Sequence, residues 1–148
     1  MTQEEKDLVL RDLCARLPFQ VICKITYIDV YVDGSIKKTR RDTYLTCDYL
    51  DDYIKGDAEC KPYLRPLSSM TEEEKRELQS FFPGSFGGQW LNLDEGFIDI
   101  YECESTTRLY LYDATGLTEW LNKKMFDFRG LIPEGLALST DVFNPYKH

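Results

Sequence analysis

Apolar and β-favouring residues, mostly Val, Ile, Thr and Tyr, fill residues 19–32 without a turn residue and predict one long β-strand. Both alternating faces of this strand are largely apolar, which is typical of a strand covered on both sides. Asp33-Gly34 follows and predicts a tight hairpin turn. The return strand, residues 36–46, carries four basic side chains and is therefore predicted to form a charged edge of the sheet.

Apolar residues recur at helical spacing in residues 3–16, directly after a capping box that Thr2 and Glu5 can form. The sequence therefore predicts an N-terminal helix with one buried stripe. Its opposite face is predicted to be a solvated surface with five charged residues: Glu4, Lys6, Arg11, Asp12 and Arg16. Residues 47–54 favour a short second helix over a continuation of the preceding strand.

A strand-to-helix junction is predicted in the middle of the chain. Pro66 forces the residue before it out of helical geometry, so the chain there is expected to be extended. Thr71 and Glu74 have the spacing of a second capping box, and the helix that they begin is expected to end at Pro83. Leu78, on that helix, is expected to face the core.

The second half of the chain predicts another hairpin, formed by residues 97–102 and 108–113, and a helix over residues 117–125 with Trp120 in the core. The last part is expected to be a packed coil with a short strand, followed by a loose tail from about residue 142. The whole chain, residues 1–148, is predicted to be a single α+β domain. Its antiparallel sheet is expected to be built from the two β-hairpins and packed with about three helices.

Composition places the chain among globular proteins, because 43% of its 148 residues are hydrophobic and 14% are aromatic. No run approaches the roughly 20 apolar residues that span a bilayer, so no membrane association is predicted. The N-terminal stretch is acidic and helical, unlike the basic and apolar leader of a secreted protein. The sequence thus predicts a soluble, cytoplasmic protein.

The residues that most often bind metals or act as nucleophiles are sparse. The five cysteines stand singly, with no C-x-x-C pair, and are interpreted as small buried hydrophobes in a reducing compartment: Cys14, Cys23, Cys47, Cys60 and Cys103. The one histidine is His148, which argues against a Ser-His-Asp or Cys-His site. No metal site, cofactor or catalytic residue is therefore predicted.

The glycine-rich stretch 83–96 is predicted to be an irregular loop, and loops carry binding residues more often than the elements they connect. It supplies the candidate partner-binding residues: Phe86, Trp90, Asp94 and Glu95. An aromatic anchor beside a charged rim is the usual composition of an interface hot spot. The alternative is that Trp90 folds back as a lid on the core, since tryptophan is highly buried on average.

The return strand also contains the one basic run of the chain: Lys37, Lys38, Arg40 and Arg41. A β-ribbon with such charges could touch phosphates, which makes nucleic-acid binding an alternative function. The net charge of −8 opposes the approach of nucleic acid, so this partner is not the favoured one. The simpler interpretation is a solvated edge strand that its lysines protect against aggregation.

Paired carboxylates offer a second alternative, a small hydrolase. The second hairpin and the loop before it contain the candidates: Asp94, Glu95, Asp99, Glu102 and Glu104. Neither the D-x-D-x-D-G spacing of a calcium loop nor a second basic partner is present, so an ordinary charged surface is the favoured interpretation.

Two stretches of the chain, YLRPLSSMTEEE at 63–74 and WLNKKMFDFRGLIPEGLAL at 120–138, resemble a family of small uncharacterised proteins. We associate that family with gut Bacteroides-type bacteria and with their prophages or other mobile elements. LCARLP at 13–18 is a weaker third piece, and the two hairpins lie outside the resemblance. Because the family carries no established activity, the resemblance implies no catalytic residue and only an accessory role in a mobile element.

The sequence as a whole therefore predicts a non-enzymatic protein-interaction or regulatory accessory protein of a phage or mobile element, with an unidentified protein as its partner. The alternatives are a nucleic-acid-binding protein that uses the basic hairpin and a small carboxylate-based hydrolase. Salt-sensitive binding to DNA or RNA would favour the first alternative. A deep pocket holding an acid of raised pKa would favour the second.

Overall fold

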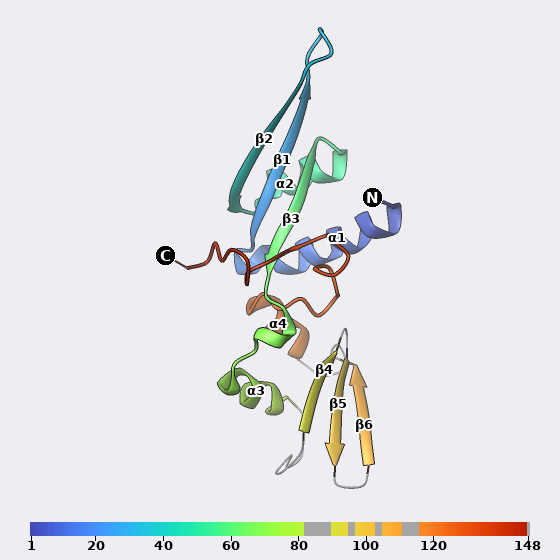
Figure 1. Ribbon diagram of the computed structural model, residues 1–148, viewed down its shortest axis with the longest axis vertical. Coiled ribbons are helices and arrows are strands. Elements are labelled where there is room, and N and C mark those ends of the chain that lie inside the picture. Colours follow the sequence, from blue (N-terminus) through green and yellow to red (C-terminus); the bar gives the residue numbers. More distant parts are fainter. Residues whose placement is uncertain (82–89, 95–96, 103–104, 111–115, 148) are drawn as a thin grey trace.

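The protein has an α+β fold whose larger sheet is curled and mixed (Figure 1). The computed structural model describes residues 1–81, 90–94, 97–102, 105–110 and 116–147. The larger sheet has four strands in the order β2-β1-β3-β7: β1 (Ile22–Val30), β2 (Ile36–Tyr44), β3 (Ala58–Leu64) and β7 (Leu138–Ser139). β1 pairs antiparallel with β2 and β3, whereas β3 and β7 are parallel.

A second, separate sheet contains β4 (Trp90–Asp94), β5 (Phe97–Glu102) and β6 (Ser105–Tyr110), all antiparallel. The prediction that both hairpins share one sheet is therefore wrong. β3 pairs with the other side of β1, and β7 adds beyond β3, so the larger sheet is built without the second hairpin. β6 also begins three residues earlier than the strand predicted from residue 108.

The described part of the chain has four α-helices, where the predicted total is about three, and each of the four ranges that the sequence favours contains one. They are α1 (Gln3–Arg16), α2 (Cys47–Lys55), α3 (Glu72–Gln79) and α4 (Leu117–Lys123). Both predicted capping boxes form, with the hydroxyl of each threonine accepting the N–H of the glutamate three residues later. The hairpin turn is also confirmed, because Gly34 takes the left-handed conformation (φ +85°) that glycine favours.

The core consists of two clusters of buried side chains. The first lies between α1, α2 and the larger sheet and includes Val9, Leu13, Cys23, Ile25 and Leu64. The second joins α3, α4 and the chain after α4: Leu78, Leu117, Leu121, Phe126 and Phe128. The complete burial of Leu78 confirms that α3 faces the core.

One residue that is expected in the core, Trp120, has a mixed environment. Trp120 is only half-buried, with its ring between those of Phe81 and Phe126 at centroid distances of 5.9 and 5.7 Å. Its indole N–H donates to Glu77 Oε2 at 2.9 Å, so the ring lies at the border of the cluster. The prediction that Trp120 belongs to the core is correct for its contacts, while one edge of the ring reaches polar atoms.

The cysteines do not share one environment. Cys23 and Cys60 are buried as predicted, and burial raises the pKa of both thiols, that of Cys60 to about 12. Cys14 and Cys47 are exposed, so their predicted burial is wrong. Cys14 points away from the stripe that buries Leu13, because successive helical residues diverge by about 100°. Cys103 lies outside the described residues.

The C-terminal segment is held against the larger sheet, whereas the sequence predicts a loose tail from about residue 142. The hydroxyl of Tyr146 accepts the N–H of Ile22 at 3.0 Å and donates to the carbonyl of Tyr63 at 3.0 Å. Ile22 and Tyr63 are the next pair after the last ladder pair of β1 and β3. The phenol therefore replaces a ladder contact at the place where the two strands separate.

The predicted solvated face of α1 is wrong at Asp12 and Arg16, which are both fully buried. Arg16 Nε donates to the Asp12 carboxylate at 2.9 and 3.0 Å, and its other nitrogens donate to the carbonyls of Asn122 and Phe126. Arg129 Nη1 donates to Asp12 at 2.6 Å. This buried cluster attaches α1 to the chain around α4.

A second ion pair attaches β3 to α3. Both terminal nitrogens of Arg65 donate hydrogen bonds to the Glu74 carboxylate, at 2.7 and 2.8 Å. The guanidinium lies 4.2 Å from the ring centroid of Phe126. Glu74 thus serves both the capping box of Thr71 and the ion pair. The hydrogen bonds from Arg65 are the largest cause that lowers the pKa of Glu74 to about 2.

This lowered pKa predicts an acid-sensitive contribution to stability. The ionised Glu74 side chain stabilises the fold fully above the ordinary carboxyl pKa of 4.5, and the contribution is lost as the pH falls towards 2. We expect the difference in unfolding free energy between the wild type and Glu74→Gln to shrink over this range in urea titrations. Glu72→Gln, which removes an exposed charge from the same helix end, is the control. An equal pH response of both variants would contradict the assignment.

Candidate functional site

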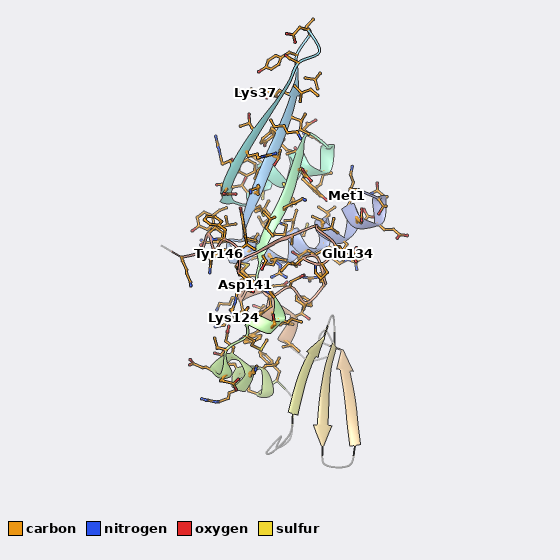
Figure 2. The ribbon with its side chains drawn as sticks, viewed as in Figure 1. Met1, Lys37, Lys124, Glu134, Asp141 and Tyr146 are labelled. Atoms are coloured by element: carbon orange, nitrogen blue, oxygen red, sulfur yellow. The ribbon has the colours of Figure 1, made fainter. Side chains whose placement is uncertain are left out.

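The hairpin β1–β2 extends beyond the rest of the larger sheet (Figure 1, top). β1 and β2 pair along their whole length, from Ile22 with Tyr44 to Val30 with Ile36. β3 pairs only with residues 23–27 of β1, because it begins at Ala58. Beyond Tyr27 the two strands pair only with each other, and Figure 2 shows Lys37 on this upper part of the hairpin. We call the hairpin, residues 22–44, the ribbon.

The strand register assigns the basic residues of the ribbon to two faces. Directly paired residues of an antiparallel ladder share a face. The inner face contains the core residues Cys23 and Ile25 and, on β2, Lys37 and Arg41. The outer face contains the alternate residues of β2: Ile36, Lys38, Arg40, Asp42 and Tyr44. The four cations predicted as a nucleic-acid site are therefore split equally between the two faces.

The inner face is attached to α2 by hydrogen bonds. The hydroxyl of Tyr27 donates to Asp52 at 2.5 Å, and this bond is the main cause that raises the pKa of Tyr27 to about 12. Arg41 Nη1 donates to the hydroxyl of Tyr49 at 3.3 Å. These bonds hold the lower half of the ribbon against the helix.

The upper half of the ribbon exposes branched aliphatic side chains. Ile28, Val30 and Ile36 lie together on the outer face with exposed fractions of 51%, 70% and 63%. Val32 in the turn is fully exposed. The prediction that the first strand is covered on both faces is correct at Cys23 but wrong here, because neither β3 nor a helix reaches this far.

A polar hollow of about 530 Å³ lies beside the ribbon, between β1 and the start of β3. Its polar lining comes from both sheet and helices: Lys6, Tyr27, Asp29, Tyr53, Asp57 and Glu59. Burial is the main cause that raises the pKa of Tyr53 to about 12. Both pKa shifts therefore favour the protonated, neutral form of the phenol.

The buried carboxylates of the described residues are occupied by structural contacts. Asp127 has a pKa raised by burial, yet its two oxygens accept the N–H groups of Leu131 and Ile132, each at 2.8 Å. Asp12 is shared by two arginines. Neither residue lines the hollow beside the ribbon. Within the described ranges, no group of three His, Cys, Asp or Glu side chains is placed to hold a metal ion.

The residues predicted to bind a partner in the stretch 83–96 are only partly described. Trp90 and Asp94 are the first and last residues of β4, so this part of the stretch is a strand and not the irregular loop that we expected. Phe86 and Glu95 lie outside the described residues. The carboxylates Asp99 and Glu102 belong to β5, and Glu104 is outside the described part. Their proposed roles remain predictions.

Comparisons of the chain with protein-family models, with curated proteins and with solved structures gave no match. The resemblance to a mobile-element family therefore remains a prediction from the sequence. Of the helices in the described ranges, none has the length and apolar character needed to cross a membrane.

Proposed function

We propose that the chain is a non-enzymatic binding protein that holds a protein partner through the ribbon. Support comes from one observation: three branched aliphatic side chains, Ile28, Val30 and Ile36, stand exposed on one face beside Lys38 and Arg40. Single exposed apolar residues are common on soluble proteins, but a contiguous apolar group with a polar border is typical of an interaction surface.

The extension of the ribbon supports the same proposal. The core ends near the last pair between β1 and β3, Tyr27 with Ala58. The residues beyond it bury no apolar cluster, and an isolated two-stranded hairpin is only marginally stable in water. The upper part of the hairpin adds no buried apolar contacts to the core. A binding role therefore explains why the hairpin extends beyond the sheet.

A regulatory or accessory role in a phage or mobile element is part of the proposal and rests on the sequence resemblance alone. The proposal also assigns a second contact region for the same partner to four residues of the stretch 83–96: Phe86, Trp90, Asp94 and Glu95. Neither element of the proposal requires a cofactor.

Nucleic-acid binding is the second candidate, because all four basic residues of β2 are exposed. Residues 19–41 hold five of the 18 basic and two of the 26 acidic residues, so this segment is +3 and the remainder of the chain is −11. Such a remainder repels a long polyanion. A carboxylate-based hydrolase has less support, since the buried acids Asp12, Glu74 and Asp127 are all committed to hydrogen bonds within the fold.

Affinity capture from nuclease-treated extract of the native host tests the proposal. We expect the wild type to retain a discrete protein, and Val30→Ser/Ile36→Ser and Lys38→Glu/Arg40→Glu to lose it at least tenfold. The control is Arg11→Glu/Lys123→Glu, which makes the same charge change on exposed helical residues. All variants should unfold within about 0.5 kcal/mol of the wild type per substitution, as surface changes do.

Two results would refute the proposal. Retention of the partner by both ribbon variants would exclude the ribbon as the binding element. Capture from untreated extract but not from nuclease-treated extract would favour the nucleic-acid alternative instead.

A further inference from the structure

The outer edge of β2 is an open strand edge. β2 is the first strand in the sheet order, and no strand in the described ranges pairs with its outer side. It is nine residues long, and every one of its residues except Thr43 is exposed. An edge of this kind presents unpaired N–H and C=O groups to which another strand can add.

The turn shows which residues of β2 direct their backbone outwards. The N–H of Tyr31 donates to the carbonyl of Ser35 at 2.8 Å, so this pair is hydrogen-bonded. Hydrogen-bonded and non-hydrogen-bonded pairs alternate along an antiparallel ladder. Lys37, Thr39, Arg41 and Thr43 therefore bond towards β1, and Leu45 continues this alternation with its N–H on Val21 at 2.8 Å.

The other residues of β2 direct their N–H and C=O groups to the open side: Ile36, Lys38, Arg40, Asp42 and Tyr44. Among the described residues, no contact outside the strand ladder occupies these groups. The spacing of the outward groups is that of the backbone of a neighbouring strand. The edge is thus a complete template for main-chain pairing.

The four cations flank this edge on both sides. Lys38 and Arg40 lie on the outer face, while Lys37 and Arg41 lie on the inner face. A ligand resting on one face would meet only two of them. A strand added at the edge places its side chains alternately on both faces and meets all four.

We infer that the ribbon binds an acidic, extended segment of its protein partner, which adds to β2 as a further strand of the larger sheet. This inference rests on the proposed function and names the chemistry of the partner. Acidic side chains of the added strand lie opposite the four cations, and an apolar side chain lies opposite Ile36. Cross-strand pairs of opposite charge stabilise such an arrangement.

Two other occupants fit the edge less well. A second copy of this chain would place one basic β2 against another, and like charges directly opposite each other destabilise a strand pair. A DNA duplex carries one charge per about 1.7 Å of its axis, and the acidic remainder of the chain opposes the approach of such a polyanion. A short acidic strand, by contrast, carries negative charge only where it lies against the ribbon.

A synthetic peptide tests the inference directly. The probe is a capped seven-residue peptide with a central threonine, two glutamates on each side and a valine at each end. In antiparallel pairing its threonine lies opposite Thr39 and its glutamates opposite the four cations. We expect the exchange of the outward N–H groups of Lys38 and Arg40, measured by NMR, to slow at least tenfold on binding. A matching peptide with lysine in place of glutamate should not slow it.

Matched N-methylated peptides separate strand addition from charge attraction. The two glutamates next to the threonine pair their N–H groups with Lys38 and Arg40, whereas the N–H groups of the two outer glutamates face away. N-methylation of the inner pair should abolish binding, and N-methylation of the outer pair should preserve it. Equal binding of both peptides would show that charge alone is responsible and would overturn the inference.

The remaining outcomes are also decisive. If a DNA duplex or a single-stranded RNA binds more tightly than the peptide and leaves the outward N–H groups unprotected, the partner is nucleic acid and the inference is wrong. If the peptide does not bind but the ribbon variants still lose the captured protein, the inference fails and the proposed function stands. If the ribbon variants keep that protein, the proposed function itself fails.

Discussion

Asp12→Ala is expected to cost about 3–5 kcal/mol of unfolding free energy, the usual effect of breaking a buried ion pair from one side. Arg16 is fully buried and would keep its charge with no carboxylate, and Arg129 would lose its 2.6 Å partner. Urea titration followed by circular dichroism measures the loss. The large effect follows from the burial of the charge and not from the strength of the pair itself.

The control for this prediction removes both charges. Asp12→Leu/Arg16→Met should recover part of the stability, because it removes the unpaired charge of Arg16, while Arg129 still lacks its carboxylate partner. Asp7→Ala, on the exposed side of α1, should change the unfolding free energy by less than about 0.5 kcal/mol. If Asp12→Ala is as mild as Asp7→Ala, the buried cluster does not attach α1 as described.

Phe126→Ala is expected to be equally damaging, at about 3–5 kcal/mol, because it leaves a large cavity in the second core cluster. Phe126 is fully buried, stacks on Trp120 at 5.7 Å and supports the guanidinium of Arg65 at 4.2 Å. Urea titration gives the free energy, and the tryptophan fluorescence of the folded state should change as well.

Phe143→Ala provides a matched comparison. Phe143 is 54% exposed and makes a T-shaped contact with the Tyr63 ring, at a centroid distance of 5.8 Å. Its loss should cost about 0.5–1.5 kcal/mol, the value of one aromatic pair. Similar costs at Phe126 and Phe143 would contradict the assignment of Phe126 to the core.

The local elements of this fold could be predicted because their causes lie within a few residues. The caps at Thr2 and Thr71 depend on a glutamate three residues later, and both form. The turn at Gly34 depends on its own backbone freedom. Such features need no knowledge of the remainder of the chain, and all three are confirmed.

The long-range features could not be predicted for the opposite reason. Asp12 and Arg16 have the spacing of an exposed helical ion pair, and the carbonyls that bury Arg16 come 106 and 110 residues later. The strand order of the larger sheet is likewise a long-range feature, because no local pattern specifies that β1 pairs with β3. An intrahelical charge pair that interrupts an apolar stripe was the one available sign.

The residues of the candidate site could be predicted from the sequence, but their arrangement in space could not. The sequence identifies Lys37, Lys38, Arg40 and Arg41 as a charged edge, and β2 is an edge strand. The division of these cations between two faces follows from the register. The upper ribbon is exposed because β3 begins only at Ala58. No local pattern in the sequence predicts that starting point.

The anchor at Tyr146 has a consequence for the order in which the chain can fold during synthesis. Its hydroxyl closes the seam between β1 and β3, yet it is made 124 residues after Ile22 and 83 residues after Tyr63. Chains fold from the N-terminal side as they emerge. The ribbon can therefore form on the ribosome while the base of its sheet is still open, and that base is sealed only after Tyr146 has emerged.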